Sequence, residues 1–338
     1  MKKYLSFLLI IIGLNTLLHA QKKEWVVLDT SNSGLPVNWI QSLAIDKNGI
    51  LWIGTQEGGL VKYENEKWKQ YNTTNSYNPS DLIHYILVDS SNNKWVCTNQ
   101  GVASFDGKNW ANKFNVPNSK IPSEVVLGMA IDKANNKWLA TTTYLKNNTK
   151  IGGGLCMFND TAWITYNKSN SLLPDNQITS IAIDKKNNKW IGTFGAGIVR
   201  FDGEKFTTYD TGNSGLLCND IHTIVIDSAD HRIIGTWGRG IFDNIGNRWT
   251  NYSSSNSGLS NNLITCITID SKGVWYIGSA EGGLSTFDGE NWAVYKKVNS
   301  GISDDYVTSI AIDKSGNKWI GTRSGGLCIF KEGGVSKY

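Results

Sequence analysis

The chain has 338 residues, of which 33 are Lys or Arg and 29 are Asp or Glu, so its formal net charge is +4. Residues 1–20 hold two lysines and no acid, which leaves 31 basic against 29 acidic residues in the rest of the chain. This balance excludes the strongly basic composition of nucleic-acid-binding proteins, so we expect no nucleic-acid partner.

Residues 1–20 have the layout of a cleavable secretory signal. Lys2 and Lys3 precede the apolar run Leu5–Ile12, and a Leu-His-Ala sequence ends the segment before Gln21. A retained membrane anchor is the alternative, but the run is short against the ~20 residues that a membrane span needs. We therefore expect the mature chain to begin near Gln21, to be periplasmic or secreted, and to contain no membrane span.

A motif then returns seven times: an Asp that follows Ile or Val, an aromatic residue or its replacement six positions later, and Thr or Ser three positions further on. The acids are separated by 43, 43, 52, 43, 43 and 43 residues and are Asp46, Asp89, Asp132, Asp184, Asp227, Asp270 and Asp313. The sixth position holds Trp52, Trp95, Trp138, Trp190, Ile233, Tyr276 and Trp319. Such a period is typical of a repeat architecture.

One unit contains four short runs that are rich in β-branched and aromatic residues, as strands are. In the fourth unit they are Ile178–Asp184, Lys189–Thr193, Gly197–Phe201 and Lys205–Tyr209. Asn, Asp and Gly fill the turns between them. Four antiparallel strands in about 43 residues match a propeller blade. Residues 21–338 are therefore predicted to form an all-β, seven-bladed β-propeller, with the recurring Trp residues in its core.

Both ends of the chain bear on closure of the ring. Trp25–Leu28 and Val335–Tyr338 each occupy the repeat position of an outermost strand, so they compete for one place in the seventh blade. We predict that Trp25–Leu28 takes it, because its Trp matches the repeat whereas Val335 does not.

Five cysteines are present, an odd number, although an exported protein could form disulfides. Cys156 and Cys328 share a repeat position but lie four units apart, so they should stand across the ring from each other. We expect the cysteines to be small buried thiols rather than disulfide partners.

The string from Val307 to Leu327 resembles the two-component regulator propeller repeat, since it combines a Ser-Ile-x-x-Asp motif with Gly-Asn-Lys-Trp-Ile-Gly-Thr and Gly-Gly-Leu. The resemblance implies the ligand-sensing part of hybrid two-component systems, which are typical of bacteria that degrade polysaccharides. Such receptors usually carry two propellers, a small β-sandwich, a transmembrane helix and kinase modules, whereas only one propeller is expected here. The resemblance therefore implies a secreted or periplasmic disc that binds a ligand or a protein.

The position after the motif Thr or Ser varies most between units, and it holds Gln56, Asn99, Thr142, Phe194, Trp237, Ala280 and Arg323. It should lie on the face where propellers usually bind. Trp237 is followed by Arg239, and this pair could stack a sugar ring or a planar anion. A surface loop that packs Trp237 against Phe194 is the alternative without a binding role.

Three further features add candidates for ligand contact. His84 and His222 share a repeat position near the channel mouth, where they could serve as metal ligands, although from blades on nearly opposite sides. Unit three carries nine extra residues around Thr142–Ile151, with Tyr144 available to fold over the face. A ring of loop residues is expected to cap turns, with cation binding as a weaker alternative: Asn38, Asp81, Glu124, Asn176, Asn219, Asn262 and Asp305.

The predicted function is that of an exported, non-catalytic binding or sensor-like propeller, with carbohydrate fragments as the ligand. The ligand-binding candidates are Trp237, Arg239, Phe194, His222, Arg323 and Tyr144, and no catalytic residue, metal or cofactor is expected. A protein-binding scaffold in the cell envelope is the alternative. An enzyme similar to the streptogramin lyases is a third reading, but no paired His and Glu is visible in the sequence.

Overall fold

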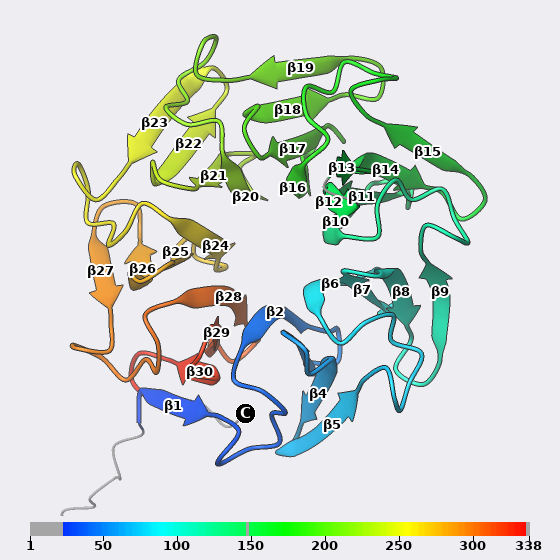
Figure 1. Cartoon of the computed structure of the whole chain (residues 1–338). Coiled ribbons are helices and arrows are strands. Elements are labelled where there is room, and N and C mark those ends of the chain that lie inside the picture. The colour runs from blue at the N-terminus through cyan, green and yellow to red at the C-terminus, as the bar shows by residue number, and fades with distance from the viewer. Residues whose placement is uncertain (1–22, 147–148, 336–338) are drawn as a thin grey trace, which may run out of the picture.

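Seven four-stranded antiparallel sheets surround a central channel in the computed structural model, which describes residues 23–146 and 149–335 (Figure 1). The predicted seven-bladed propeller is therefore confirmed. The proposed signal segment, residues 1–20, lies outside the described residues. In the described part of the chain, no helix is long and apolar enough to cross a membrane.

The blades follow one another around the ring. Within each blade the first strand lines the channel and the fourth strand lies at the rim. Blade one contains β2 (Ile40–Ile45), β3 (Leu51–Thr55), β4 (Leu60–Glu64) and β5 (Lys67–Tyr71). Blade two contains β6 (Ile83–Val88), β7 (Lys94–Thr98), β8 (Gly101–Phe105) and β9 (Trp110–Phe114). Blade three contains β10 (Val126–Ile131), β11 (Lys137–Thr141), β14 (Gly154–Phe158) and β15 (Trp163–Tyr166). Blade four contains β16 (Ile178–Ile183), β17 (Lys189–Thr193), β18 (Ile198–Phe201) and β19 (Phe206–Tyr209).

The remaining blades have the same order. Blade five contains β20 (Ile221–Ile226), β21 (Arg232–Thr236), β22 (Ile241–Ile245) and β23 (Arg248–Tyr252). Blade six contains β24 (Ile264–Ile269), β25 (Trp275–Ser279), β26 (Gly283–Phe287) and β27 (Trp292–Tyr295). Blade seven contains β28 (Val307–Ile312), β29 (Lys318–Thr322), β30 (Leu327–Phe330) and β1 (Trp25–Leu28). The extra residues of unit three form a hairpin of β12 (Tyr144–Lys146) and β13 (Thr149–Ile151).

The repeated Asp and Trp are joined by a hydrogen bond that explains their fixed spacing. In blade four, Trp190 Nε1 donates to Asp184 Oδ2 at 2.9 Å, while Oδ1 accepts the backbone N–H groups of Lys186 and Asn188 in the turn. The carboxylate thus closes the turn between the first two strands and satisfies the indole N–H inside the core. The recurring Trp residues are buried, as predicted.

The second strand of every blade is buried along its whole length, because it is sandwiched between two neighbouring sheets. The blades approach most closely near the channel. A Cβ atom on Gly54 would lie 2.6 Å from Ile83 Cγ2 of the next blade. Glycine at this position therefore allows the sheets to pack tightly around the axis.

The ring is closed by β1, which pairs with β30 in the register Trp25 opposite Phe330. The two rings stack with their centroids 4.4 Å apart. The prediction that Trp25–Leu28 fills this place is confirmed. Val335 instead packs in the core cluster between blades one and seven, and the rest of the competing C-terminal segment lies outside the described residues.

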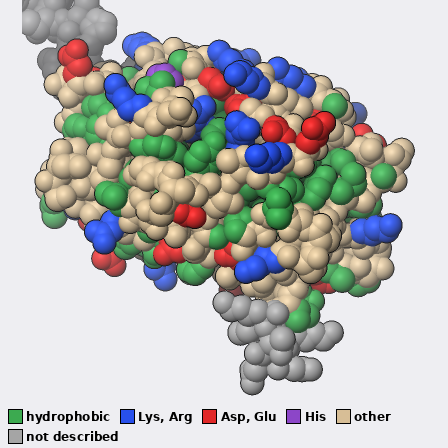
Figure 2. All heavy atoms as spheres, turned by 90° about the horizontal axis from the view of Figure 1, so that it is seen from above, with side chains coloured by type: hydrophobic (Ala, Val, Ile, Leu, Met, Phe, Trp, Pro, Cys, Tyr) green, Lys and Arg blue, Asp and Glu red, His purple; other side chains and the backbone are tan. Residues whose placement is uncertain are grey.

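All five cysteines are free, and Cys97, Cys156 and Cys328 are buried. The expectation of buried, unpaired thiols therefore holds for these three, whereas Cys218 and Cys266 are unpaired but only half-buried. Seen edge-on, the visible surface of the disc carries interspersed basic and acidic side chains rather than a field of one sign (Figure 2).

Candidate functional site

The central channel contains a cavity of about 410 Å³ that is lined by the first strands of all seven blades. Its walls carry Ser, Thr, His and aliphatic side chains, and its described lining contains no Lys, Arg, Asp or Glu. A cavity with such walls favours a neutral ligand surface with several hydroxyl groups over a highly charged one.

At the repeat position five residues before each Asp, some side chains join neighbouring blades and others are free of that task. Thr179, Thr265 and Thr308 each donate a hydroxyl hydrogen bond to the first strand of the next blade, at 2.5 to 2.6 Å. These threonines join neighbouring blades. The other four units lack a hydroxyl here and carry Gln41, His84, Leu127 and His222.

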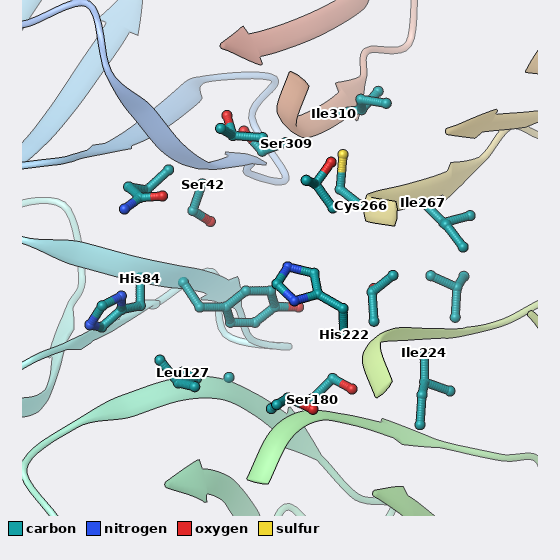
Figure 3. A pocket seen from close by; sticks show the side chains of 18 of the residues that line it. Ser42, His84, Leu127, Ser180, His222, Ile224, Cys266, Ile267, Ser309 and Ile310 are labelled. Carbon is teal, nitrogen blue, oxygen red and sulfur yellow. The ribbon is translucent and has the colours of Figure 1, made fainter. Parts of the chain in front are cut away.

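His222 pairs with Trp237 at the mouth of the channel. Their ring centroids are 5.3 Å apart with the planes tilted by 39°. The imidazole of His222 points toward the channel axis (Figure 3), and desolvation by the surrounding protein lowers its pKa. Trp237 remains 39% exposed beside it. The two residues form a shelf with one aromatic face and a neutral ring that can both donate and accept a hydrogen bond.

His84 lies apart from this shelf, and its ring turns away from the channel axis (Figure 3). Burial lowers its pKa to about 4, and its Nε2 atom is enclosed without a hydrogen-bond partner. The structure therefore does not bring the two histidines together as ligands. Within residues 23–146 and 149–335, no group of three or more His, Cys, Asp or Glu residues could hold a metal ion.

Arg323 is held between two aromatic rings where blades seven and one meet. Its guanidinium carbon lies 4.9 Å from the ring centroid of Trp39 and 5.1 Å from that of Tyr306. Both aromatic residues immediately precede a first strand. The sequence reasoning missed them, although this position varies as much as the one that holds Arg323: Trp39, Leu82, Val125, Gln177, Asp220, Leu263 and Tyr306.

The other candidates lie on the same face but in separate blades. Phe194 is 53% exposed and forms an isolated bridge with Asp220 of the next blade. Arg239 is exposed, and its charge lowers the pKa of the Cys218 thiol, although burial has the larger, raising effect. Tyr144 begins the hairpin β12–β13 of blade three.

Trp237 therefore lies against His222, and the described ring contacts do not join it to Phe194 or Arg239. The alternative in which Trp237 packs on Phe194 stays a prediction. The grouping of His222 with Trp237 could have been found from the sequence, since both residues break the repeat pattern within one unit.

Six of the seven loop acids and amides, all except Glu124, cap turns in the described residues, as expected first. Asp81 Oδ1 accepts the backbone N–H of Thr73 at 2.8 Å, and Asn219 Oδ1 accepts that of Thr211 at 3.0 Å. The same contact recurs for Asn38, Asn176, Asn262 and Asp305. These oxygens therefore accept hydrogen bonds within the fold.

Solved structures share this architecture at low sequence identity. The extracellular domain of BT3049 from B. thetaiotaomicron, assigned to a hybrid two component system, aligns with a TM-score of 0.77 and 23% identity over 92% of this chain and 41% of that one. The chain thus spans about two fifths of that structure. Virginiamycin B lyase from Staphylococcus aureus aligns with a TM-score of 0.71 and 13% identity over 90% of this chain and 98% of that one.

A third similar structure is PorZ, a surface component of the type-IX secretion system of Porphyromonas gingivalis. It aligns with a TM-score of 0.59 and 18% identity, over 88% of this chain and 48% of that one. At these identities the likeness shows the fold alone. No curated protein sequence matches the chain with significance.

The family model described as two component regulator propeller matches residues 34–57, which include the loop before β2, the strands β2 and β3, and the Asp46–Trp52 motif. The same motif recurs in the six other blades. Residues 34–57 are therefore similar to a two component regulator propeller repeat.

Proposed function

We propose that the chain is an exported, non-catalytic binding propeller that recognises carbohydrate fragments at the mouth of its channel. Residues 1–20 serve as its secretory signal, and the mature protein works in the periplasm or outside the cell. The likeness to extracellular domains assigned to two component systems supports this placement and a sensor-like role. The observation that carries the proposal is the shelf formed by Trp237 and His222 beside an uncharged channel.

The chemistry of the shelf suits a sugar. An exposed indole face offers the flat apolar surface on which the C–H face of a pyranose ring packs. Desolvation lowers the pKa of His222 and so favours the neutral imidazole, which can donate and accept hydrogen bonds with sugar hydroxyls. Phe194, Arg239, Tyr144 and Arg323 surround the mouth from neighbouring blades and complete the proposed set of contacts.

The test is calorimetric titration of the mature protein with a panel of neutral and acidic oligosaccharides. We expect Trp237→Ala to weaken binding of the saccharide that binds best by about tenfold or more, because the stacking surface is lost. The matched control is Tyr77→Ala, since Tyr77 is 76% exposed but lies in the loop between blades one and two. Equal affinity in wild type and Trp237→Ala would contradict the proposed site.

A protein-binding role is the second candidate, and one observation favours it. Apolar side chains are strongly exposed on the loops that connect successive blades: Tyr77 at 76%, Leu172 at 76%, Leu217 at 60% and Val298 at 89%. Exposed apolar groups spread over several loops are typical of a contact with another protein rather than with a small ligand. Loss of partner capture from envelope extracts in Leu172→Ser and Val298→Ser, with saccharide binding absent in wild type, would favour this role.

A further inference from the structure

Arg323 is built into the channel mouth as a positioned cation. Its guanidinium is exposed to solvent, yet its carbon lies within about 5 Å of the ring centroids of both Trp39 and Tyr306. The backbone also fixes its place, since the N–H of Arg323 donates to the carbonyl of Tyr306 at 3.0 Å. These contacts restrict the side chain of Arg323 to one place at the channel mouth.

The charge of Arg323 is not paired with an acid among the described residues. Among the ion pairs of the described residues, none involves its guanidinium. The nearby acid, Asp304, is already occupied: its Oδ2 accepts hydrogen bonds from the backbone and the hydroxyl of Ser324 at 2.7 and 2.6 Å, and its Oδ1 accepts the N–H of Tyr306 at 3.0 Å. These bonds hold the loop that carries Arg323. The N–H donors of the Arg323 guanidinium remain available for a ligand.

Amide groups lie next to this cation in blade one. Gln56 donates its backbone N–H to the carbonyl of Trp39 at 3.0 Å, so its backbone pairs with that of the residue whose ring contacts Arg323. Gln41 Nε2 in turn donates to Gln56 Oε1 at 2.5 Å, which leaves the Gln56 Nε2 group as a donor directed away from this bond. Blade one thus supplies both the ring of Trp39 that contacts the guanidinium and the amide pair of Gln41 and Gln56.

Such a set recognises a planar anion. The guanidinium presents parallel N–H donors that match the two oxygens of a carboxylate, and stacking on aromatic faces fixes its orientation before the ligand arrives. The channel below is lined by neutral hydroxyl, imidazole and aliphatic groups, which suit the remainder of a sugar but offer no second charge.

From this arrangement we infer that the protein binds saccharides that carry a carboxylate, and that Arg323, supported by Trp39 and Tyr306, reads the carboxylate where blades seven and one meet. The inference rests on the proposed carbohydrate function and adds a substrate class to it. The neutral part of the ligand extends over the channel mouth toward the shelf of Trp237 and His222.

The experiment compares tri-galacturonate with the neutral trisaccharide maltotriose, and includes sodium D-glucuronate as the smallest probe. Wild type should bind tri-galacturonate at least about tenfold more tightly than maltotriose. Arg323→Gln should remove this preference, because it weakens binding of tri-galacturonate at least about tenfold more than binding of maltotriose. Arg323→Lys keeps the charge but not the planar donors, so it should recover only part of the preference.

The matched control is Arg248→Gln, because Arg248 is exposed on the outer strand β23, away from the mouth. It should keep the wild-type preference. Equal effects of Arg323→Gln and Arg248→Gln would overturn the inference, as would wild type that binds neither tri-galacturonate nor glucuronate. If Trp237→Ala leaves all saccharides unaffected while Arg323→Gln abolishes glucuronate binding, the proposed shelf fails and the carboxylate site stands.

Discussion

Ile233 of blade five and Trp275 of blade six pack in one buried cluster, where five other blade junctions place a cation over an aromatic ring. At those junctions the first residue of a second strand lies over the ring of the preceding blade, as Lys189 does over Trp138 at 4.7 Å. The same contact joins Lys94 to Trp52, Lys137 to Trp95, Arg232 to Trp190 and Lys318 to Tyr276. Blade five has lost the ring and blade six has lost the cation, so the two changes compensate each other.

Substitutions of Ile233 and Trp275 should therefore have strongly coupled effects on the free energy of unfolding. Trp275→Lys should lower the free energy of unfolding by about 3–5 kcal/mol, because it removes a buried indole and places an ammonium over an aliphatic side chain. Adding Ile233→Trp should restore more than about 1 kcal/mol of this loss by rebuilding the repeat's cation–π contact. Urea denaturation of the two single variants and the double variant measures the coupling, and strictly additive losses would refute the compensation.

Protonation of His84 should make stability depend on pH between about 4 and 6.5. Burial lowers the pKa of His84 from 6.5 to about 4, so the unfolded chain binds this proton more readily than the folded one in that window. The unfolding free energy should accordingly fall as the pH drops from 6.5 toward 4, by up to about 3 kcal/mol for this residue. Urea denaturation at several pH values should show a shallower fall for His84→Gln than for wild type, and identical slopes would contradict the assignment.

The carboxylates of the repeated Asp residues should make stability depend on pH in a lower range than His84 does. Burial raises the pKa of Asp184, but hydrogen bonds from Trp190 and Asn188 outweigh it, and the net direction is below 3.8. Because the folded pKa is depressed, this contribution is present above about pH 4 and is lost as the pH falls through the folded value. Asp184→Asn should cost about 1–3 kcal/mol at neutral pH and reduce the acid sensitivity below pH 4, as followed by tryptophan fluorescence. An acid transition unchanged from wild type would speak against this role.

Removal of the closing strand should open the ring. Deletion of residues 21–30 takes away β1 and its pairing with β30, and Trp25→Ala alone removes the indole that stacks on Phe330. The deletion should lower the melting temperature by many degrees, and Trp25→Ala should cost about 3 kcal/mol. Lys67→Ala, at an exposed position of β5, should change stability by less than about 0.5 kcal/mol. A deletion variant that melts like wild type would show that closure does not depend on β1.

The repeat pattern predicted the fold in detail because each recurring residue has one local task. The spacing of Asp184 and Trp190 follows from a hydrogen bond within one blade, and the position of Trp25 follows from the same period. The candidate site was predicted less completely. Breaks in the pattern pointed to Trp237, His222 and Arg323, but not to Trp39 and Tyr306, which precede the first strands and contact Arg323 across a blade junction.

The sequence by itself determined the number of blades, the strand order, the turn caps and the strand that closes the ring, since these depend on residues a fixed number of positions apart. The tertiary structure decided which pattern-breaking side chains meet. His222 contacts Trp237 within one blade, whereas Arg323 reaches Trp39 only because ring closure brings blade seven against blade one, 284 positions away along the chain. Contacts of that kind depend on the curvature and twist of the whole ring, which no local spacing encodes.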